Sequence, residues 1–153
     1  MKEISNDGAL TTSETSLPSE ERPNIIFVQL ESYFDPTEVE WLRFSEDPTY
    51  FDDADLLIAA DCTAYAYGNF HEKFIRGRIT LIGCPKLDAV DYAEKLTAIF
   101  AAHSIRSVTV ARMEVPCCGG IEQAVQRAIA ASGKAISCHV TVIGTDGTIQ
   151  EER

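Results

Sequence analysis

The sequence has no long apolar run, and basic residues are scarce in its first third. No stretch approaches the roughly 18–20 apolar residues of a membrane span. The first 22 residues have no apolar core of the kind found in secretory signals, so we expect a cytoplasmic protein without membrane contact. Residues 1–55 hold 14 Asp and Glu against three Lys and Arg. Because no basic patch is available there for phosphates, we expect no nucleic-acid partner.

Closely spaced cysteine pairs of the CxxC kind are also missing, although the chain has five cysteines. An odd number of cysteines without an export signal favours metal, cluster or redox use of the thiols over a disulfide framework. Apolar residues make up 45% of the 153-residue chain. That fraction is ordinary for a globular domain with an appendage, so a packed core is expected.

The composition divides the chain into three segments. Residues 1–22 are rich in Ser, Thr, Glu and Asn, which predicts a disordered acidic tail. Residues 23–49 include a candidate strand at 24–30 (NIIFVQL) that can add at most an edge strand to a sheet. Residues 50–150 alternate between strand and helix patterns, and we expect them to form a self-sufficient domain.

The periodicity of this domain is typical of repeated βα units. It predicts strands at 55–60, 78–82, 107–112 and 139–143, and helices at 65–76, 89–103 and 120–132. Each crossover is long enough for a helix, so the sheet should be largely parallel with helices on its faces. The expected fold class is α/β: a single three-layer domain with a mostly parallel sheet of four or five strands, preceded by the disordered tail. Asp88 is expected to cap the middle helix, and Gly77 and Gly133 to follow helix ends.

Three successive predicted strands are followed by cysteine. Cys62 follows the first strand of the domain, Cys84 the second, and the pair Cys117-Cys118 the third. Because the carboxyl ends of parallel strands lie along one edge of a sheet, we expect these thiols to converge. We therefore predict that Cys62, Cys84, Cys117 and Cys118 ligate a metal or a cluster as thiolates. The alternative is that cysteine serves at these positions as a small buried apolar residue.

The two adjacent cysteines are expected to be unequal, because neighbouring side chains of an extended chain point in opposite directions. One thiol should face Cys62 and Cys84, while the other packs inward or touches a second atom of a multi-iron cluster. Cys118 is nearer to the glycines and to the N-terminus of the following helix, whose N–H groups favour a thiolate. Cys118 is therefore predicted to be the exposed thiol with the lower pKa.

Other polar residues of the domain have more than one interpretation. Cys138 precedes the last predicted strand, at the opposite edge of a parallel sheet, and is predicted to be structural. His71 could supply a proton or a ligand, although a histidine exposed on a helix is the commoner case. His103 suits a charge–dipole contact at a helix C-terminus, and His139 has no visible partner. Asp61 could tune a cluster or cap the following helix.

The segment PNIIFVQLESYFDP, with LRFSEDP after it, resembles the opening strand of lipoteichoic acid synthase-like enzymes of the alkaline phosphatase and sulfatase superfamily. The resemblance covers residues 23–48 and implies that Glu31 matches a divalent-metal ligand of that family. The chain has no room for the family's threonine nucleophile, Asp-His pair and further histidine. The segment is therefore interpreted as a fragment, and a remnant of a metal-dependent sulfatase or phosphotransferase-like protein is one alternative for the chain.

Three motifs of the following domain, AADC, IGCPKLD and MEVPCCGG, resemble the C-terminal domain of bacterial 4Fe-4S ferredoxin-type iron–sulfur cluster-binding proteins. In those relatives the domain follows a ferredoxin module whose CxxCxxCxxxCP run holds [4Fe–4S] clusters. This chain has the lipoteichoic acid synthase-like fragment in that place. The resemblance covers about residues 50–149 and implies an iron–sulfur cofactor and a redox partner protein.

The leading hypothesis is an iron–sulfur or metal-binding accessory domain in redox or electron transfer, more a module than an enzyme on its own. The suspected cofactor is a [4Fe–4S] cluster, with zinc as the alternative. A second hypothesis, from another class, is a structural zinc or apo interaction domain with no redox role.

Overall fold

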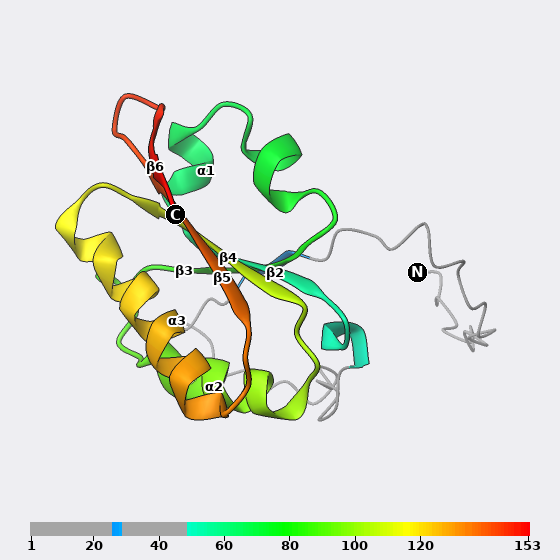
Figure 1. Ribbon diagram of the computed structural model, residues 1–153. Coiled ribbons are helices and arrows are strands. Elements are labelled where there is room, and N and C mark those ends of the chain that lie inside the picture. Colours follow the sequence, from blue (N-terminus) through cyan, green and yellow to red (C-terminus); the bar gives the residue numbers. More distant parts are fainter. Residues whose placement is uncertain (1–25, 29–48) are drawn as a thin grey trace, which may run out of the picture.

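Six strands form one sheet in the computed structural model, which describes residues 26–28 and 49–153 (Figure 1). Their order across the sheet is β1 (Ile26–Val28), β3 (Ile79–Gly83), β2 (Asp55–Ala60), β4 (Ser107–Met113), β5 (Ser137–Ile143) and β6 (Ile149–Glu152). β1 to β5 run parallel, and β6 returns antiparallel along β5. The predicted α/β fold with a mostly parallel sheet is confirmed. β1 lies at the edge, which is the place expected for the strand candidate at 24–30.

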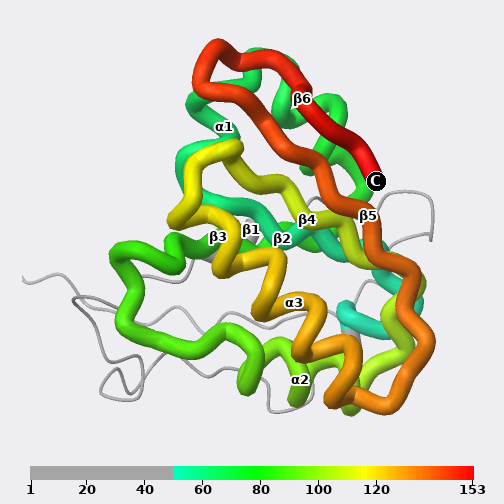
Figure 2. Tube along the Cα trace, turned by 60° about the vertical axis from the view of Figure 1, so that its left-hand side comes forward, coloured from blue at the N-terminus to red at the C-terminus, as the bar shows by residue number. Residues whose placement is uncertain are grey.

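Helices cover both faces of the sheet, which gives the expected three layers. α2 (Tyr92–Ala102) and α3 (Gly119–Ser132) lie against one another on one face, while α1 (Thr63–Ala66) and the π-helix η3 (His71–Ile75) lie on the other (Figures 1 and 2). Two short 3-10 helices, η2 (Thr49–Phe51) and η4 (Pro116–Cys118), precede β2 and α3. Of the helices in the part of the chain that is described, none combines the length and apolar character needed to cross a bilayer.

The third helix follows the predicted periodicity. Ile121, Ala124, Val125 and Ala128 are buried at i, i+3, i+4 and i+7 and give α3 one apolar face. Gly133 ends the helix at φ 71°, a left-handed conformation that glycine adopts without steric cost. The predicted positions of α3 and of its C-terminal glycine are therefore confirmed.

The single helix predicted at 65–76 is wrong. The chain forms the four-residue α1, leaves the helical conformation at Tyr67 (φ −100°, ψ 110°) and re-forms as the π-helix η3. Phe70 and Phe74 are both buried, with ring centroids 5.0 Å apart, and Tyr67 meets Phe74 edge-on at 5.6 Å. Aromatic packing on the sheet therefore decides the conformation here, over the local helical pattern.

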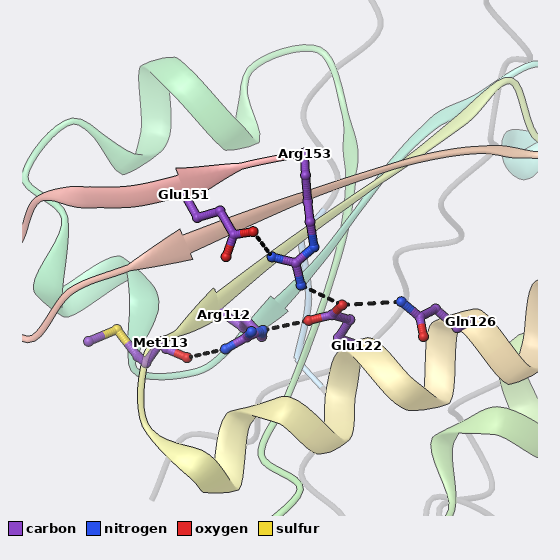
Figure 3. Close-up of polar contacts among 6 residues, drawn as sticks. All are labelled: Arg112, Met113, Glu122, Gln126, Glu151 and Arg153. Carbon is purple, nitrogen blue, oxygen red and sulfur yellow. Dashed lines mark hydrogen bonds and ion pairs between the residues drawn. The ribbon is translucent and has the colours of Figure 1, made fainter.

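The face of β4 that is turned toward α3 carries a network of hydrogen bonds centred on Glu122. Arg112 points to the α3 face, where its Nε donates to Glu122 Oε2 at 2.7 Å (Figure 3). Glu122 also accepts from Arg153 at 2.7 Å and from Gln126 at 3.1 Å. Burial opposes the charge of Glu122, but hydrogen bonds from Arg153 and Arg112 outweigh it and hold the pKa below its ordinary value. This carboxylate joins β4 and α3 to Arg153, the residue that follows β6.

We predict that Glu122→Gln destabilises the fold by about 2–4 kcal/mol at neutral pH, because Arg112 is left without its partner charge at a mostly buried position. Since the pKa of Glu122 is lowered by folding, its contribution is present above its ordinary value of 4.5 and is lost as the pH falls through the lower, folded value. Urea unfolding at neutral and acidic pH measures the effect. The exposed Glu151→Gln is the control, and an equal loss from both variants would contradict the assignment.

Residues 49–153 contain five of the six strands, and the buried core of the described residues lies between Phe51 and Ile143. We therefore predict that deletion of residues 1–48 leaves a cooperative thermal unfolding transition, at a lower Tm because β3 loses its pairing with β1. Differential scanning calorimetry of the two proteins is the measurement. A non-cooperative transition would show that the N-terminal segment belongs to the core.

Candidate functional site

The ends of three neighbouring strands bring cysteines to one edge of the sheet. β3, β2 and β4 are adjacent and parallel, with Ala60 opposite Gly83 and Ala59 opposite Ala111. Cys84 follows β3 directly, Cys62 lies two residues beyond β2, and Cys118 belongs to η4 after β4. The structure thus places these three thiols at the carboxyl edge, where the sequence predicted them.

Two of the thiols are in contact. The sulfurs of Cys62 and Cys118 lie 3.8 Å apart, in a hydrogen bond for which either thiol can be the donor. Cys118 is only 3% exposed and belongs to the core, and Cys62 is partly buried against it. We call Cys62 and Cys118 the thiol pair.

The thiol pair occupies the point where the direction of the crossovers reverses. From β2 the chain passes through α1 and η3 to β3 on one side, whereas from β4 it passes through α3 to β5 on the other side. These connections leave on opposite faces of the sheet (Figure 1). In open α/β sheets, ligands bind in the crevice outside the strand ends at such a reversal. Cys62 and Cys118 border that position.

Cys84 lies in a separate loop, which is held in shape by hydrogen bonds from the Cys84 backbone N–H. Its N–H donates to Asp88 Oδ2 at 2.9 Å and to the Tyr92 hydroxyl oxygen at 2.8 Å, and the Tyr92 hydroxyl donates to Asp88. Burial, followed by the hydrogen bond to Asp88, raises the pKa of Tyr92. A Cβ on Gly83 would come within 2.5 Å of the Tyr92 hydroxyl oxygen, so glycine is required beneath this ring.

Asp88 was expected to cap the middle helix, and that prediction is wrong. Asp91 is the N-cap of α2, with its side chain accepting from the Ala93 N–H at 3.0 Å. Asp88 binds the Cys84 N–H instead. The role of Tyr92 in the IGCPKLD loop was not predicted, although its position four residues after Asp88 is a signal for it.

The loop that carries Cys84 also touches the turn that carries the adjacent cysteines. A Cβ built on Gly120 would lie 3.1 Å from Pro85 Cβ, so the two segments approach so closely that a larger residue would push them apart by a few tenths of an ångström. The motifs IGCPKLD and PCCGG therefore meet in space.

The expected roles of the adjacent cysteines are reversed: Cys117 is exposed and Cys118 is buried. The prediction assumed an extended chain at this point. Pro116 instead starts the 3-10 helix η4, in which the Cys118 N–H donates to Val115 O at 3.1 Å. This turn directs Cys118 into the core and leaves Cys117 at the surface.

The pKa prediction for Cys118 is also wrong in sign. Burial raises the pKa of Cys118 despite a hydrogen bond from the Met113 backbone that favours the thiolate. Burial also raises the pKa of Cys62 to about 12, and the neighbouring Cys118 adds to the shift. Loss of hydration therefore outweighs the hydrogen bonds that favour the thiolates, and both members of the thiol pair are neutral near pH 7.

Cys138 lies at the other end of the sheet. It pairs with Val108 near the beginning of β4, whereas Cys118 lies beyond the end of β4. Burial raises its pKa, with a further contribution from Glu122. Cys138 is thus remote from the thiol pair along the strand direction.

The histidines occupy three unrelated environments. His71 is exposed at the start of η3, and His139 is exposed on β5, with Nε2 3.3 Å from the Ser137 hydroxyl. His103 is buried, and its Nδ1 lies 3.3 Å from Asp52 Oδ1, while the charge–dipole contact expected for it stays a prediction. Asp61 gives no side-chain cap to α1, whose N-cap is Cys62. Glu31 lies outside the described residues.

The carboxyl edge brings together fewer possible metal ligands than a closed metal site needs. Over residues 26–28 and 49–153, no three His, Cys, Asp or Glu side chains are grouped closely enough to hold a metal ion. A surface cavity of about 380 Å³ lies elsewhere, between η3 and strands β4 to β6, and its lining includes Lys73, Arg78 and His139 but no cysteine. The thiol pair is therefore the chemically distinctive feature of the carboxyl edge.

A family model described as a Rossmann-like domain matches residues 48–153. The chain belongs to this Rossmann-like domain family. An uncharacterized protein of Archaeoglobus fulgidus is 26% identical over 95 residues, which are 62% of this chain and 67% of the archaeal protein. No solved structure matches the chain at a significant level. The ferredoxin-type and lipoteichoic acid synthase-like resemblances are not tested by these matches and stay predictions.

The order of alkylation tests the arrangement of the thiols. In metal-free, reduced protein near pH 7 we expect iodoacetamide to label Cys117 at least about tenfold faster than Cys62 or Cys118, because Cys118 is buried, Cys62 is partly buried, and both thiols are neutral. Labelling of Cys62 should accelerate as the pH rises toward its pKa of about 12. Mass spectrometry of the labelled peptides gives the rates, and faster labelling of Cys118 than of Cys117 would contradict the described turn.

Proposed function

We propose that this protein is a cysteine-ligated metal-binding domain that serves redox or electron-transfer chemistry as an accessory module. The observation that carries the proposal is the contact between Cys62 and Cys118 at the crossover reversal of a Rossmann-like sheet. Dinucleotide-binding versions of this fold have a glycine-rich turn, G-x-G-x-x-G, at the first strand end. This chain has Asp61, Cys62 and Thr63 after β2 instead.

The separation of the thiol pair suits ligation of one metal ion. Two thiolates bound to one tetrahedral ion at about 2.3 Å each have sulfurs about 3.8 Å apart. Cys62 Sγ and Cys118 Sγ are 3.8 Å apart. A bound cation also favours the thiolate forms, which burial alone disfavours here. Binding should therefore release protons from the pair.

A [4Fe–4S] cluster does not fit the pair as it stands. In such a cluster each thiolate binds its own iron, so ligand sulfurs lie farther apart than two sulfurs in contact. The Cys62–Cys118 contact fits two thiolates on a single ion, as in a zinc site or at one iron of a smaller iron–sulfur cluster. Cys84, inorganic sulfide or a partner group would complete the coordination.

The proposed redox partner is a protein that docks at the carboxyl edge. Tyr65 of α1 is 94% exposed and Leu87, in the loop after Cys84, is 69% exposed. These apolar side chains belong to the segments that carry Cys62 and Cys84, and Cys117 is exposed in the third such segment. A partner at this edge would cover the apolar side chains and reach the metal-binding thiols over a short path.

A second candidate is a structural zinc or apo interaction domain without a redox role. The burial and raised pKa of the thiol pair favour it, because neutral buried thiols also serve as inert core residues. Zinc also forms two thiolate bonds with the observed separation of sulfurs. The two candidates differ in the bound element and in its redox activity.

We predict that protein purified without oxygen contains iron with acid-labile sulfide, and that Cys62→Ser and Cys118→Ser each remove most of the metal because they break the thiol pair. Cys84→Ser is expected to lower the metal content less. Elemental analysis, sulfide assay and the visible spectrum are the measurements, and Cys138→Ser is the matched control.

Zinc without sulfide would support the structural candidate and overturn the redox proposal. Equal metal loss from Cys138→Ser would show that the thiol pair is not the site. A wild-type protein that binds neither iron nor zinc, after reconstitution with either metal and with sulfide, would overturn the metal-binding proposal and the structural zinc site, and would leave only the apo interaction domain.

A further inference from the structure

The thiol pair has the geometry of a dithiol that is ready to be oxidised. Its sulfurs must approach by about 1.8 Å to reach a disulfide bond length of about 2.05 Å. Cys62 lies in the turn between β2 and the four-residue α1, and Cys118 lies in the three-residue η4. Both sulfurs are thus carried by short turns at strand ends, where a small change of side-chain torsion is not opposed by the sheet pairing.

We infer that Cys62 and Cys118 form a reversible disulfide by exchange with an external disulfide, so that the protein has a two-electron dithiol couple in addition to the proposed metal site. The couple needs no metal. Only its competition with metal for the same two sulfurs rests on the proposed function.

Access decides which thiol reacts first. Cys62 is partly exposed, whereas Cys118 is 3% exposed and has Cys62 beside it. The Cys62 thiolate attacks a disulfide RSSR, forms a Cys62–SR mixed disulfide and expels RS⁻. The Cys118 thiolate then attacks the Cys62 sulfur, forms the Cys62–Cys118 bond and expels the second RS⁻. The two protein thiols lose two electrons and two protons, and RSSR becomes two RSH.

The alternative partner for Cys118 is its sequence neighbour. A Cys117–Cys118 disulfide would close a strained ring within one dipeptide, and Cys117 is at the surface while Cys118 points to the core. The contact with Cys62 joins residues 56 positions apart without that ring strain. The geometry therefore selects the long-range pair over the adjacent one.

Exchange near neutral pH is expected to be slow, because Cys62 is only partly exposed and Cys118 is buried. Since the thiolate is the attacking form, exchange should be faster at pH 9 than at pH 7. A bound metal ion would hold both sulfurs and protect them from the external disulfide.

The test uses the full-length, metal-free, reduced protein in anaerobic glutathione and glutathione disulfide at pH 7 and pH 9. Mass spectrometry of unreduced peptides should show a Cys62–Cys118 crosslink that dithiothreitol reverses. Cys117→Ser and Cys138→Ser are expected to keep the crosslink. Cys118→Ala should stop at a Cys62–glutathione mixed disulfide, and circular dichroism establishes that each variant is folded.

A Cys117–Cys118 crosslink, or glutathionylation without any crosslink in the wild type, would overturn the inference. If Cys118→Ala does not fold, Cys62→Ser replaces it and must abolish the crosslink. The result is independent of the metal assays: a crosslink in a protein that binds no metal overturns only the proposed metal site, and metal binding without a crosslink overturns only the disulfide. Equal oxidation rates with and without bound metal would show that the two do not share sulfurs.

Discussion

The parallel pairing of β3, β2 and β4 is the constraint on which the site depends. With Ala60 opposite Gly83 and Ala59 opposite Ala111, the three strands end close to one level, so residues that follow them come together. The reversal of crossover direction then sends the chain after β2 and the chain after β4 to opposite faces. Cys62 and Cys118 meet between these departing segments although 56 positions separate them.

The sheet is predictable from the sequence, because apolar residues recur with the period of the strand or helix that buries them. Alternating βα units, the end of α3 at Gly133 and the edge that carries the cysteines all follow from local patterns. The break between α1 and η3 does not, because it depends on the packing of Phe70 and Phe74 over the sheet. The hairpin strand β6 was missed for a similar reason: its residues are mostly exposed, and its pairing with β5 sets its conformation.

The edge of the sheet at which the cysteines lie was predictable, but the burial and ionisation of their thiols were not. The position of a cysteine after a strand fixes the edge of the sheet on which it lies. The burial of its thiol depends instead on a few dihedral angles of the turn. Pro116 begins a 3-10 helix, and this turns Cys118 toward the core and Cys117 toward solvent. Burial then raises the pKa of Cys118, because the hydration lost by a buried thiolate exceeds what the hydrogen bonds from Met113 and Cys62 return.

Cys84 is held by hydrogen bonds of its own, which explains how three nearby strand ends can differ in their chemistry. Asp88 and Tyr92 bind the Cys84 N–H, so this loop keeps its shape whether or not the thiols react. The thiols of Cys62 and Cys118 instead contact one another across two segments, and the Met113 backbone adds a hydrogen bond to Cys118. Each of the two proposed reactions replaces that weak thiol–thiol hydrogen bond with stronger bonds, to a metal or between the sulfurs. Since both proposed reactions use the same two sulfur atoms, we expect the redox state of the pair to set whether the edge can hold a metal.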